Sequence, residues 1–530
     1  MKRTAKILCM MLAVILSVIT ATYAAASESQ ALKDINVPVA YISESKGGEA
    51  IWEAKTGTAV FKLNGKTLEV KASANQLTFN GRTTALKNKT ANAGGRTLLP
   101  LSVVNEALGL EMSNDDYLKL IAAKFIDLIK KDQIQEGSAL LSRQFSKYLT
   151  PQLLAVIAQS IKTIPFDEKT VAINKTAVHQ NLVIPAVVQQ INLNFIIRFD
   201  YDGKIDEIGS AQPQQALYSA PAYDSPENYT EQEVVIGRDE WKLPATLTVP
   251  KGKGPFPAII LVHGSGAGDR DETVGAVKPF RDLAVGLAAK NIAVLRYDKR
   301  TLEHGLKIQL SPLFTMKEEF EEDAFAAAEY LKNNDLIDAS NIIVLGHSQG
   351  GYALPGIMDS DSSGIFKAGI ILSGCSRPIY ELMIEQNEYF MNKGLATKEQ
   401  VDYIKNQVNM IKDPAFDPAR PPADYALGTP FYFNHMKNYD VIGAAKAIQK
   451  PVLVMQGDAD FQVSVKTDFE GWKNAFKNNK AAEFKLYPGL NHVYTDVNVN
   501  GTIEDYYIKA NIPQTVIDDI SSFVNKVAAK

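Results

Sequence analysis

The C-terminal part of the chain alternates short apolar runs, rich in β-branched residues, with longer stretches of helical periodicity. Strands that are apolar on both faces and separated by helices predict a mostly parallel sheet covered by helices. The predicted strands are residues 241–249, 258–262, 292–296, 342–345, 368–372, 452–456 and 483–487. This pattern predicts an α/β domain over residues 229–530.

A long insertion, residues 376–447, separates the fifth and sixth of these strands, where a simple crossover would be much shorter. We interpret it as a helical lid. Its predicted helices are residues 379–393 and 398–412. Aromatic residues follow them, and two interpretations stay open: they pack in the lid's own core, or they line the substrate. Tyr432 and Phe433 are the candidate substrate-binding residues.

Near the N-terminus, apolar and polar positions alternate with a period of two, and Asn-Gly pairs separate the runs. Asn-Gly between alternating strands is the strongest short signal for a β-hairpin. The predicted strands are residues 59–63, 66–70 and 76–79. A β-rich domain is therefore predicted over residues 36–112.

A second small domain is predicted over residues 115–212, where helical patterns come first and strand-like patterns follow. That order is typical of an α+β unit. The predicted helices are residues 117–131, 135–142 and 152–164, and the predicted strands are residues 171–173 and 189–199. Residues 213–228, rich in Gln, Pro, Ser and Ala, are predicted to be a linker.

Residues 1–26 have the three parts of a secretory signal peptide: a basic start, an apolar run and small residues before the cleavage site. The apolar run, residues 7–19, is shorter than the roughly 20 residues that a bilayer-spanning helix needs. No later segment is long and apolar enough to span a membrane. We therefore expect a bacterial protein that is cleaved near Ala26 and is secreted or held at the cell surface.

Charge and cysteine content narrow the classes of function. Loss of Lys2, Arg3 and Lys6 with the leader changes the net charge from −4 to −7, which disfavours nucleic acid as a partner. Cys375 is the only cysteine beyond the leader, which excludes an internal disulfide and a cysteine metal cluster. The sequence also lacks an HExxH motif, so no metal or other cofactor is expected.

The motif GHSQG, residues 346–350, lies between a predicted strand and a helix-compatible stretch. A tight strand-to-helix turn needs small residues two places before and after its serine, so that the hydroxyl stands clear of the sheet at the positive end of the helix. This context makes Ser348 the candidate nucleophile.

A serine hydroxyl becomes nucleophilic when an imidazole takes its proton, and a carboxylate orients that imidazole. In this type of fold, both partners follow the serine on loops after later strands. Of six histidines, only His492 lies late and just beyond a predicted strand. Asp458 and Asp460 both follow another strand, and we choose Asp460 because it lies further into the loop. The predicted triad is therefore Ser348, Asp460 and His492.

The oxyanion that forms during attack needs two N–H donors, one from the residue after the nucleophile and one from a loop after an early strand. Gln349 provides the first. The segment HGSG follows strand 258–262, so the backbone N–H of Ser265, or failing that of Gly264, is the predicted second donor. The side chain of His263 is expected to be structural.

Five segments, "LVHGSGAGDRDE", "LRYDKRT", "LGHSQGG", "VMQGDADFQV" and "YPGLNHVY", resemble the α/β-hydrolase family of secreted carboxylesterases and serine-aminopeptidase-like hydrolases. The resemblance covers residues 232–530 and implies cleavage of short acyl esters without a cofactor. Thr301 stands where relatives usually have glycine. In that segment Asp298 and Arg300 are expected to form an ion pair, and the acidic run 318–323 to be an exposed helix start.

The N-terminal segments also resemble known domains. The hairpins followed by "RTLLPLSVVNEALGL" are similar to the copper-amine-oxidase-like N-terminal domain of secreted Gram-positive proteins. No histidine precedes His179, so this module is expected to be a metal-free accessory near the cell wall. The following α+β unit resembles a small domain of unknown function with the cone shape of nuclear-transport-factor-like folds.

Three functions are compared. The leading hypothesis is a carboxylesterase that acts on a small ester through an acyl-serine intermediate. The first alternative is an aminopeptidase or small-peptide hydrolase, which needs an acidic subsite; Glu381, Glu385 and Glu388 of the lid are candidates for it. The second is a surface protein with a relic hydrolase domain, which the presence of all three triad members and both oxyanion donors disfavours.

Overall fold

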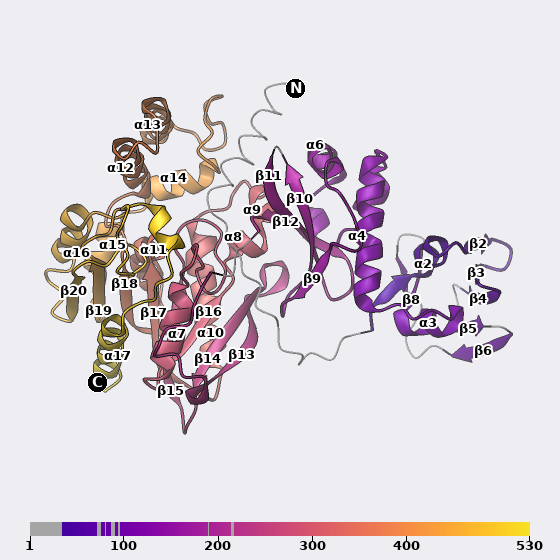
Figure 1. Cartoon of the computed structure of the whole chain (residues 1–530), viewed down its shortest axis with the longest axis horizontal. Coiled ribbons are helices and arrows are strands. Elements are labelled where there is room, and N and C mark those ends of the chain that lie inside the picture. Colours follow the sequence, from indigo (N-terminus) through magenta and orange to yellow (C-terminus); the bar gives the residue numbers. More distant parts are fainter. Residues whose placement is uncertain are drawn as a thin grey trace. The chain divides into compact units, whose positions relative to one another are not determined.

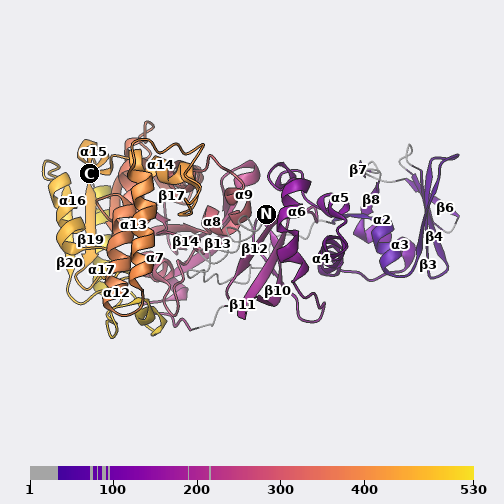
Figure 2. The same cartoon turned by 90° about the horizontal axis from the view of Figure 1, so that it is seen from above.

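The computed structural model describes residues 34–71, 76–79, 81–85, 91–93, 96–188, 190–213 and 217–529 (Figures 1 and 2). The predicted signal peptide lies outside these residues. The chain divides into two compact units, residues 25–211 and a hydrolase unit that begins at Gln212. Among the described residues, no helix is both long and apolar enough to cross a bilayer.

The first unit begins with two small antiparallel sheets. One is the meander β2 (Glu49–Glu53), β3 (Thr58–Leu63), β4 (Lys66–Lys71), β5 (Gln76–Phe79) and β6 (Arg82–Ala85). The other joins β1 (Asn36–Pro38), β8 (Arg96–Pro100) and β7 (Ala91–Ala93), with α2 (Val39–Ser45) and α3 (Leu101–Leu108) nearby in the chain. Asn64 and Gly65 both have positive φ, at 51° and 74°. Such a turn matches the twist of the strands that it joins.

The α+β part of this unit consists of α4 (Asn114–Lys130), α5 (Ile134–Ser138), α6 (Pro151–Lys162) and a four-stranded antiparallel sheet. Its strands are β9 (Ala172–Lys175), β10 (Gln180–Val188), β11 (Ile191–Phe199) and β12 (Ile205–Ala211). The predicted strand 189–199 corresponds to β11 and begins two residues too early, because the chain turns before Ile191, which pairs with Val188. Residues 180–188 were not predicted as a strand.

The hydrolase unit contains one eight-stranded sheet with the order β13-β14-β16-β15-β17-β18-β19-β20. The strands are β13 (Tyr229–Ile236), β14 (Leu243–Pro250), β15 (Phe256–Val262), β16 (Ala293–Tyr297), β17 (Ile337–His347), β18 (Phe366–Leu372), β19 (Val452–Gly457) and β20 (Ala482–Tyr487). The first two pairings are antiparallel and the remaining five are parallel. The α/β class and mostly parallel sheet are therefore confirmed; strand β13 was not predicted.

Helices bury both faces of this sheet (Figure 1). On one face lie α7 (Pro279–Ala288) and α17 (Gln514–Ala528), and on the other lie α10 (Asp323–Lys332), α11 (Gln349–Asp359), α15 (Val441–Ala447) and α16 (Glu470–Ala475). Along β15, Ile259 and Leu261 join the first core while Ala258, Ile260 and Val262 join the second. This alternation is the period-two pattern of a strand buried on both faces.

Part of the predicted linker is bound to the hydrolase unit. Tyr218 donates a hydrogen bond of 2.6 Å from its hydroxyl to Asp282 on α7. Tyr223 donates one of 2.8 Å to the carbonyl oxygen of Ile512, just before α17. Residues 217–228 therefore form a strap on the hydrolase unit.

The lid consists of α12 (Ile379–Asn392), α13 (Lys398–Lys412), α14 (Pro430–Asn438) and the short helix α15. Helices α12, α13 and α14 group together beyond one end of the sheet, and α12 and α13 run side by side (Figures 1 and 2). A capping box formed by Thr397 and Gln400 starts α13, which coincides with the predicted helix 398–412. The aromatic run 431–433 lies in α14.

Candidate active site

Ser348 lies on a strained turn between β17 and α11. Its φ and ψ angles are 53° and −116°, a region that non-glycine residues avoid. The N–H of Ser348 is held by the carbonyl oxygen of Leu372 at 2.9 Å, and its own carbonyl oxygen accepts the first hydrogen bond of α11 from Tyr352. Gln349 is the first residue of α11, and the N–H groups of the first helical turn have no acceptor within the helix, so the N–H of Gln349 is one of these donors.

The glycines of the motif are required by space. A Cβ atom on Gly346 would lie 2.2 Å from the carbonyl oxygen of Gly350, and one on Gly350 would lie 2.4 Å from that of Val262. Gly264, from the loop after β15, approaches Ser348 so closely that a Cβ atom added to it would lie 3.0 Å from Cβ of Ser348. The turn and this loop therefore pack backbone against backbone around the serine.

Asp460 and His492 are brought together at the carboxyl ends of β19 and β20. Nδ1 of His492 donates to Oδ2 of Asp460 at 2.8 Å, and the Asp460 side chain is fully buried. The other carboxylate oxygen accepts the N–H groups of Gln462 and Val463 at 2.8 and 3.0 Å. With Nδ1 committed to Asp460, Nε2 of His492 is the nitrogen left to accept a proton. Asp458 instead binds the N–H of Gly489.

His347 and Glu272 fix the His492 loop to the serine turn, and sequence reasoning missed both roles. Nε2 of His347 donates to the carbonyl oxygen of His492 at 3.0 Å, and the two imidazole rings are 4.9 Å apart. Nδ1 of His347 lies 2.9 Å from the carboxylate of Glu272. Burial lowers the pKa of His347, but the Glu272 carboxylate more than offsets it, so the net pKa is raised. His347 lies in the segment LGHSQGG and Glu272 in LVHGSGAGDRDE, so their places in these two segments were the only indication of a role that the sequence offered.

The other oxygen of Glu272 accepts the N–H of Gly264 at 2.7 Å. Gly264, the second choice for the oxyanion donor, therefore already uses its N–H. Ser265 is exposed on the same loop, and no hydrogen bond from its N–H is found within the described part of the chain. The side chain of His263 is buried, with Nε2 donating to the carbonyl oxygen of Asp269 at 2.8 Å. Burial lowers the pKa of His263 to about 4, so the ring is neutral near neutral pH.

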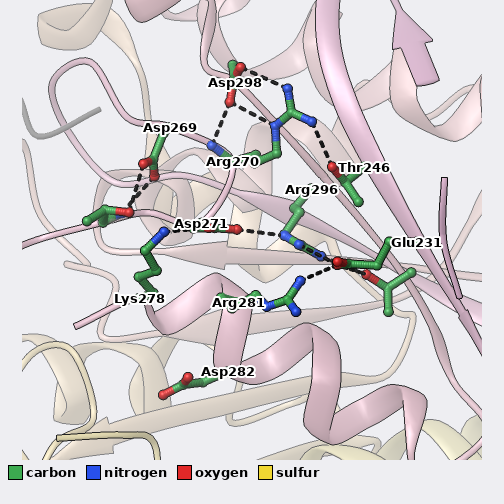
Figure 3. Close-up of polar contacts among 12 residues, drawn as sticks. Glu231, Thr246, Asp269, Arg270, Asp271, Lys278, Arg281, Asp282, Arg296 and Asp298 are labelled. Carbon is green, nitrogen blue, oxygen red and sulfur yellow. Dashed lines mark hydrogen bonds and ion pairs between the residues drawn. The ribbon is translucent and has the colours of Figure 1, made fainter. Parts of the chain in front are cut away.

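Charged side chains hold the loop that follows, residues 269–278 (Figure 3). Arg270 forms a bidentate pair with Asp298 at 3.0 and 3.1 Å and also binds Glu233 at 2.6 Å. Asp271 lies between Arg296 and Lys278, each 2.9 Å away. Burial opposes the charge of Asp271, but these two cations outweigh it and hold the pKa of that carboxyl far below its usual range.

Two expectations about charges were wrong. Asp298 pairs with Arg270, as described above, and Arg300 pairs instead with Asp323 at 2.5 Å. The acidic run 318–323 is not an exposed helix start, because Glu319 and Asp323 are only 4% and 1% exposed. Both acids point inward to cations that follow β16, a match that depends on how distant segments pack.

The lid reaches the serine turn through Tyr432. Nε2 of Gln349 donates to the Tyr432 hydroxyl at 2.6 Å, and that hydroxyl donates to Glu319 at 2.5 Å. The ring of Tyr432 stacks on Phe314 at 6.1 Å and meets Phe433 edge to face. Both rings pack against the core of the hydrolase unit, and Tyr432 is in addition joined to the predicted site through Gln349.

The three lid glutamates considered for the acidic subsite of a peptidase each lie beside a cation. Glu385 is paired with Arg377, and Glu388 with Lys405 at 2.6 Å. Glu381 lies 3.4 Å from Lys412. All three carboxylates thus have a cationic partner on or beside the lid helices, and each is partly exposed.

Comparisons with known proteins agree with this architecture. Residues 29–122 match the copper amine oxidase N-terminal domain, and residues 303–415 match the prolyl oligopeptidase family. Among the described residues, no group of three or more His, Cys, Asp or Glu side chains is arranged to hold a metal ion. The chain is 30% identical to the esterase EstD of Thermotoga maritima over 407 residues, which cover 76% of this chain and 94% of EstD.

Solved structures give lower similarity. Est1E from Butyrivibrio proteoclasticus is 23% identical, with a TM-score of 0.38 over 56% of this chain and 99% of that one. A putative dipeptidyl aminopeptidase IV from Bacteroides ovatus is 15% identical, with a TM-score of 0.37 over 67% of this chain and 43% of that one.

The strand order and the serine turn define an α/β-hydrolase. The 30% identity to EstD, over nearly the whole length of EstD, shows the family within this class: the chain belongs to the esterase family of α/β-hydrolases that includes EstD.

The serine turn predicts a strong response to one methyl group. Gly346→Ala should destabilise the hydrolase unit by about 1–3 kcal/mol or more, because the new Cβ would overlap a carbonyl oxygen that cannot move. Gly305→Ala is the matched control, since its Cβ would meet nothing within 4 Å. Urea unfolding of both variants checks this, and equal midpoints would contradict the packing described.

The pair of His347 and Glu272 predicts a pH dependence of stability. Because the folded-state pKa of His347 lies above its ordinary 6.5, the stabilisation is complete below that value and is lost as pH rises through the folded pKa. We therefore expect the unaltered chain to exceed His347→Gln in free energy of unfolding by more at about pH 6 than at about pH 9. A difference that stays constant, or grows with pH, would count against the pair.

Proposed function

We propose that this protein is a secreted serine esterase that cleaves short-chain carboxylic esters through an acyl-serine intermediate. The observation that carries the proposal is the hydrogen bond between His492 and the buried carboxylate of Asp460. The loop that bears His492 is in turn bound to the Ser348 turn by His347. Membership of the EstD family supports the ester as substrate class.

In the proposed reaction, Oγ of Ser348 attacks the acyl carbon while Nε2 of His492 takes its proton. Asp460 orients the imidazole and stabilises its charged form. The tetrahedral oxyanion is stabilised by the N–H groups of Gln349 and Ser265. His492 then gives its proton to the alcohol oxygen, the alcohol leaves, and water hydrolyses the acyl-serine by the same steps.

The surroundings of Ser348 support a small ester over a peptide. An aminopeptidase must bind a free ammonium group, and the three lid carboxylates considered for that purpose are already paired with cations. Tyr432 lies against Gln349, beside the nucleophile, which supports a role for the lid in limiting the size of the acyl group. Phe433 remains a proposal for the lining of a more distant part of the substrate.

The proposal of export rests on the sequence of residues 1–26, with its basic start, apolar run and small residues before the cleavage site. The match of residues 29–122 to a copper amine oxidase N-terminal domain supports an accessory module directly after the leader. We propose that this module keeps the enzyme near the cell wall.

The triad predicts a clear ranking of variants. Ser348→Ala should abolish hydrolysis of p-nitrophenyl acetate and butyrate. Asp460→Asn should lower kcat by about 10⁴, because an amide cannot hold the imidazole in its productive tautomer. Asp458→Asn is the matched control on the same loop and should retain activity, since its side-chain oxygen can still accept the N–H of Gly489.

Steady-state kinetics on both esters, beside an aminoacyl p-nitroanilide, distinguish the candidate functions. Cleavage of the anilide alone would make the protein a peptidase. Equal losses in the two aspartate variants would remove Asp460 from its role.

A further inference from the structure

A continuous line of buried polar contacts joins the two sides of the proposed oxyanion hole. Nζ of Lys299 donates to the carbonyl oxygen of Gly264 at 2.6 Å and lies 2.6 Å from Glu319. Glu319 in turn accepts from the hydroxyl of Tyr432, which accepts from the side chain of Gln349. The line thus begins at the peptide group before Ser265 and ends at the residue after the nucleophile.

The contact at Gly264 acts on a single peptide group. A peptide is planar and trans, so the C=O of Gly264 and the N–H of Ser265 point in opposite directions. A side chain that fixes the C=O therefore fixes the direction of the N–H. An ammonium on the carbonyl oxygen also draws electron density from the amide, which makes that N–H a stronger donor to a developing oxyanion. Lys299 can thus orient and polarise a donor that it does not touch.

Stability alone does not account for this arrangement. Lys299 and Glu319 are 1% and 4% exposed, and taking two charges out of water costs several kcal/mol per ion. Well-packed apolar residues of the same volume are often as stable as a buried ion pair. Here each charged group has one partner in the pair and another on the path to Ser348, which gives the pair a use beyond packing.

Tyr432 is the only member of this line that comes from the lid. It reaches Glu319 from α14, whereas Lys299 follows β16 and Glu319 lies in the π-helical turn η4 (Lys317–Glu322) before α10. Burial and the neighbouring Glu319 raise the pKa of Tyr432 well above its usual value, so its hydroxyl remains a donor. Movement of α14 away from the core would leave Glu319 without that donor and Gln349 without its acceptor.

We propose that Lys299, Glu319 and Tyr432 are positioning residues for the oxyanion hole, through which the lid helix α14 controls transition-state stabilisation at Ser348. The inference rests on the acyl-serine reaction proposed above. The three residues hold the Ser265 N–H and the Gln349 side of the site in their working arrangement only when the lid is in place.

The test measures the rate at which a fluorophosphonate labels Ser348. During phosphonylation, negative charge develops on the phosphonyl oxygen in the same hole as fluoride leaves, and no particular ester substrate is required. Tyr432→Phe removes one hydroxyl, and the double variant Lys299→Met with Glu319→Gln removes the charges without leaving either one unpaired. Tyr425→Phe is the matched control: it is a lid tyrosine whose hydroxyl has no hydrogen-bond partner among the described residues.

We expect labelling to slow by about tenfold in Tyr432→Phe, less than the 10²–10³ typical of deleting an oxyanion donor outright, because the donor is misaligned and not removed. The double variant should slow further, and Tyr425→Phe should label at the unaltered rate. With p-nitrophenyl acetate, kcat per fluorophosphonate-titrated active site should fall while KM stays constant; a loss of folded enzyme would instead lower the number of titratable sites and leave kcat per site unchanged.

Equal labelling of Tyr432→Phe and the unaltered chain would overturn the inference while leaving the esterase proposal intact. Failure of the unaltered chain to label at Ser348 would overturn both. If the double variant does not fold, Tyr432→Phe decides the question alone, since it removes only one oxygen atom.

Discussion

Buried charge on the loop after β15 is the constraint on which the site depends. Within residues 264–272, Glu272 binds His347 of the nucleophile turn, and Arg270 and Asp271 bind strands at the antiparallel edge of the sheet. These links are ionic, and the His492 loop is bound in turn by His347. Each charge removed from water must find its counter-charge, or the loop loses several kcal/mol. This requirement leaves the loop one arrangement, and the backbone of Ser265 is positioned as a result.

The triad members are oriented mainly by backbone groups and by neighbouring residues, so their reacting atoms need few contacts of their own. Asp460 is oriented by two backbone N–H groups of its own loop, so its second oxygen is available to His492. His492 is fixed through its carbonyl oxygen, which leaves the imidazole in the site. Ser348 is held in its strained conformation by two backbone hydrogen bonds and by the close approach of Gly264. Support thus comes from backbone and neighbouring residues, and the reacting side chains are kept for chemistry.

The sequence predicts those features that local pattern determines. The parallel strands, the Asn-Gly hairpin and the lid helices all follow from periodicity and turn residues, and the order serine, acid, histidine follows from the fold. Partners of buried charges could not be predicted this way. Asp298 and Arg300 are two residues apart, yet each pairs with a residue from another segment. The chain leaves β16 at Tyr297 and enters the short helix α8 (Arg300–Glu303), so the strand pattern does not fix the directions of these two side chains. Strand β10 was missed because it begins with two polar residues, Gln180 and Asn181, which the sequence pattern does not mark as buried although both are.

The strap formed by residues 217–228 has a consequence for how this gene could have been assembled. Tyr218 and Tyr223 belong by their contacts to the hydrolase, although by composition they belong to the connection before it. A junction placed at the first strand of the sheet would remove the Tyr218 hydroxyl from Asp282 and the Tyr223 hydroxyl from the carbonyl oxygen of Ile512. A module boundary that keeps both contacts intact therefore lies upstream of Tyr218, and only there could the N-terminal modules be exchanged without loss to the hydrolase.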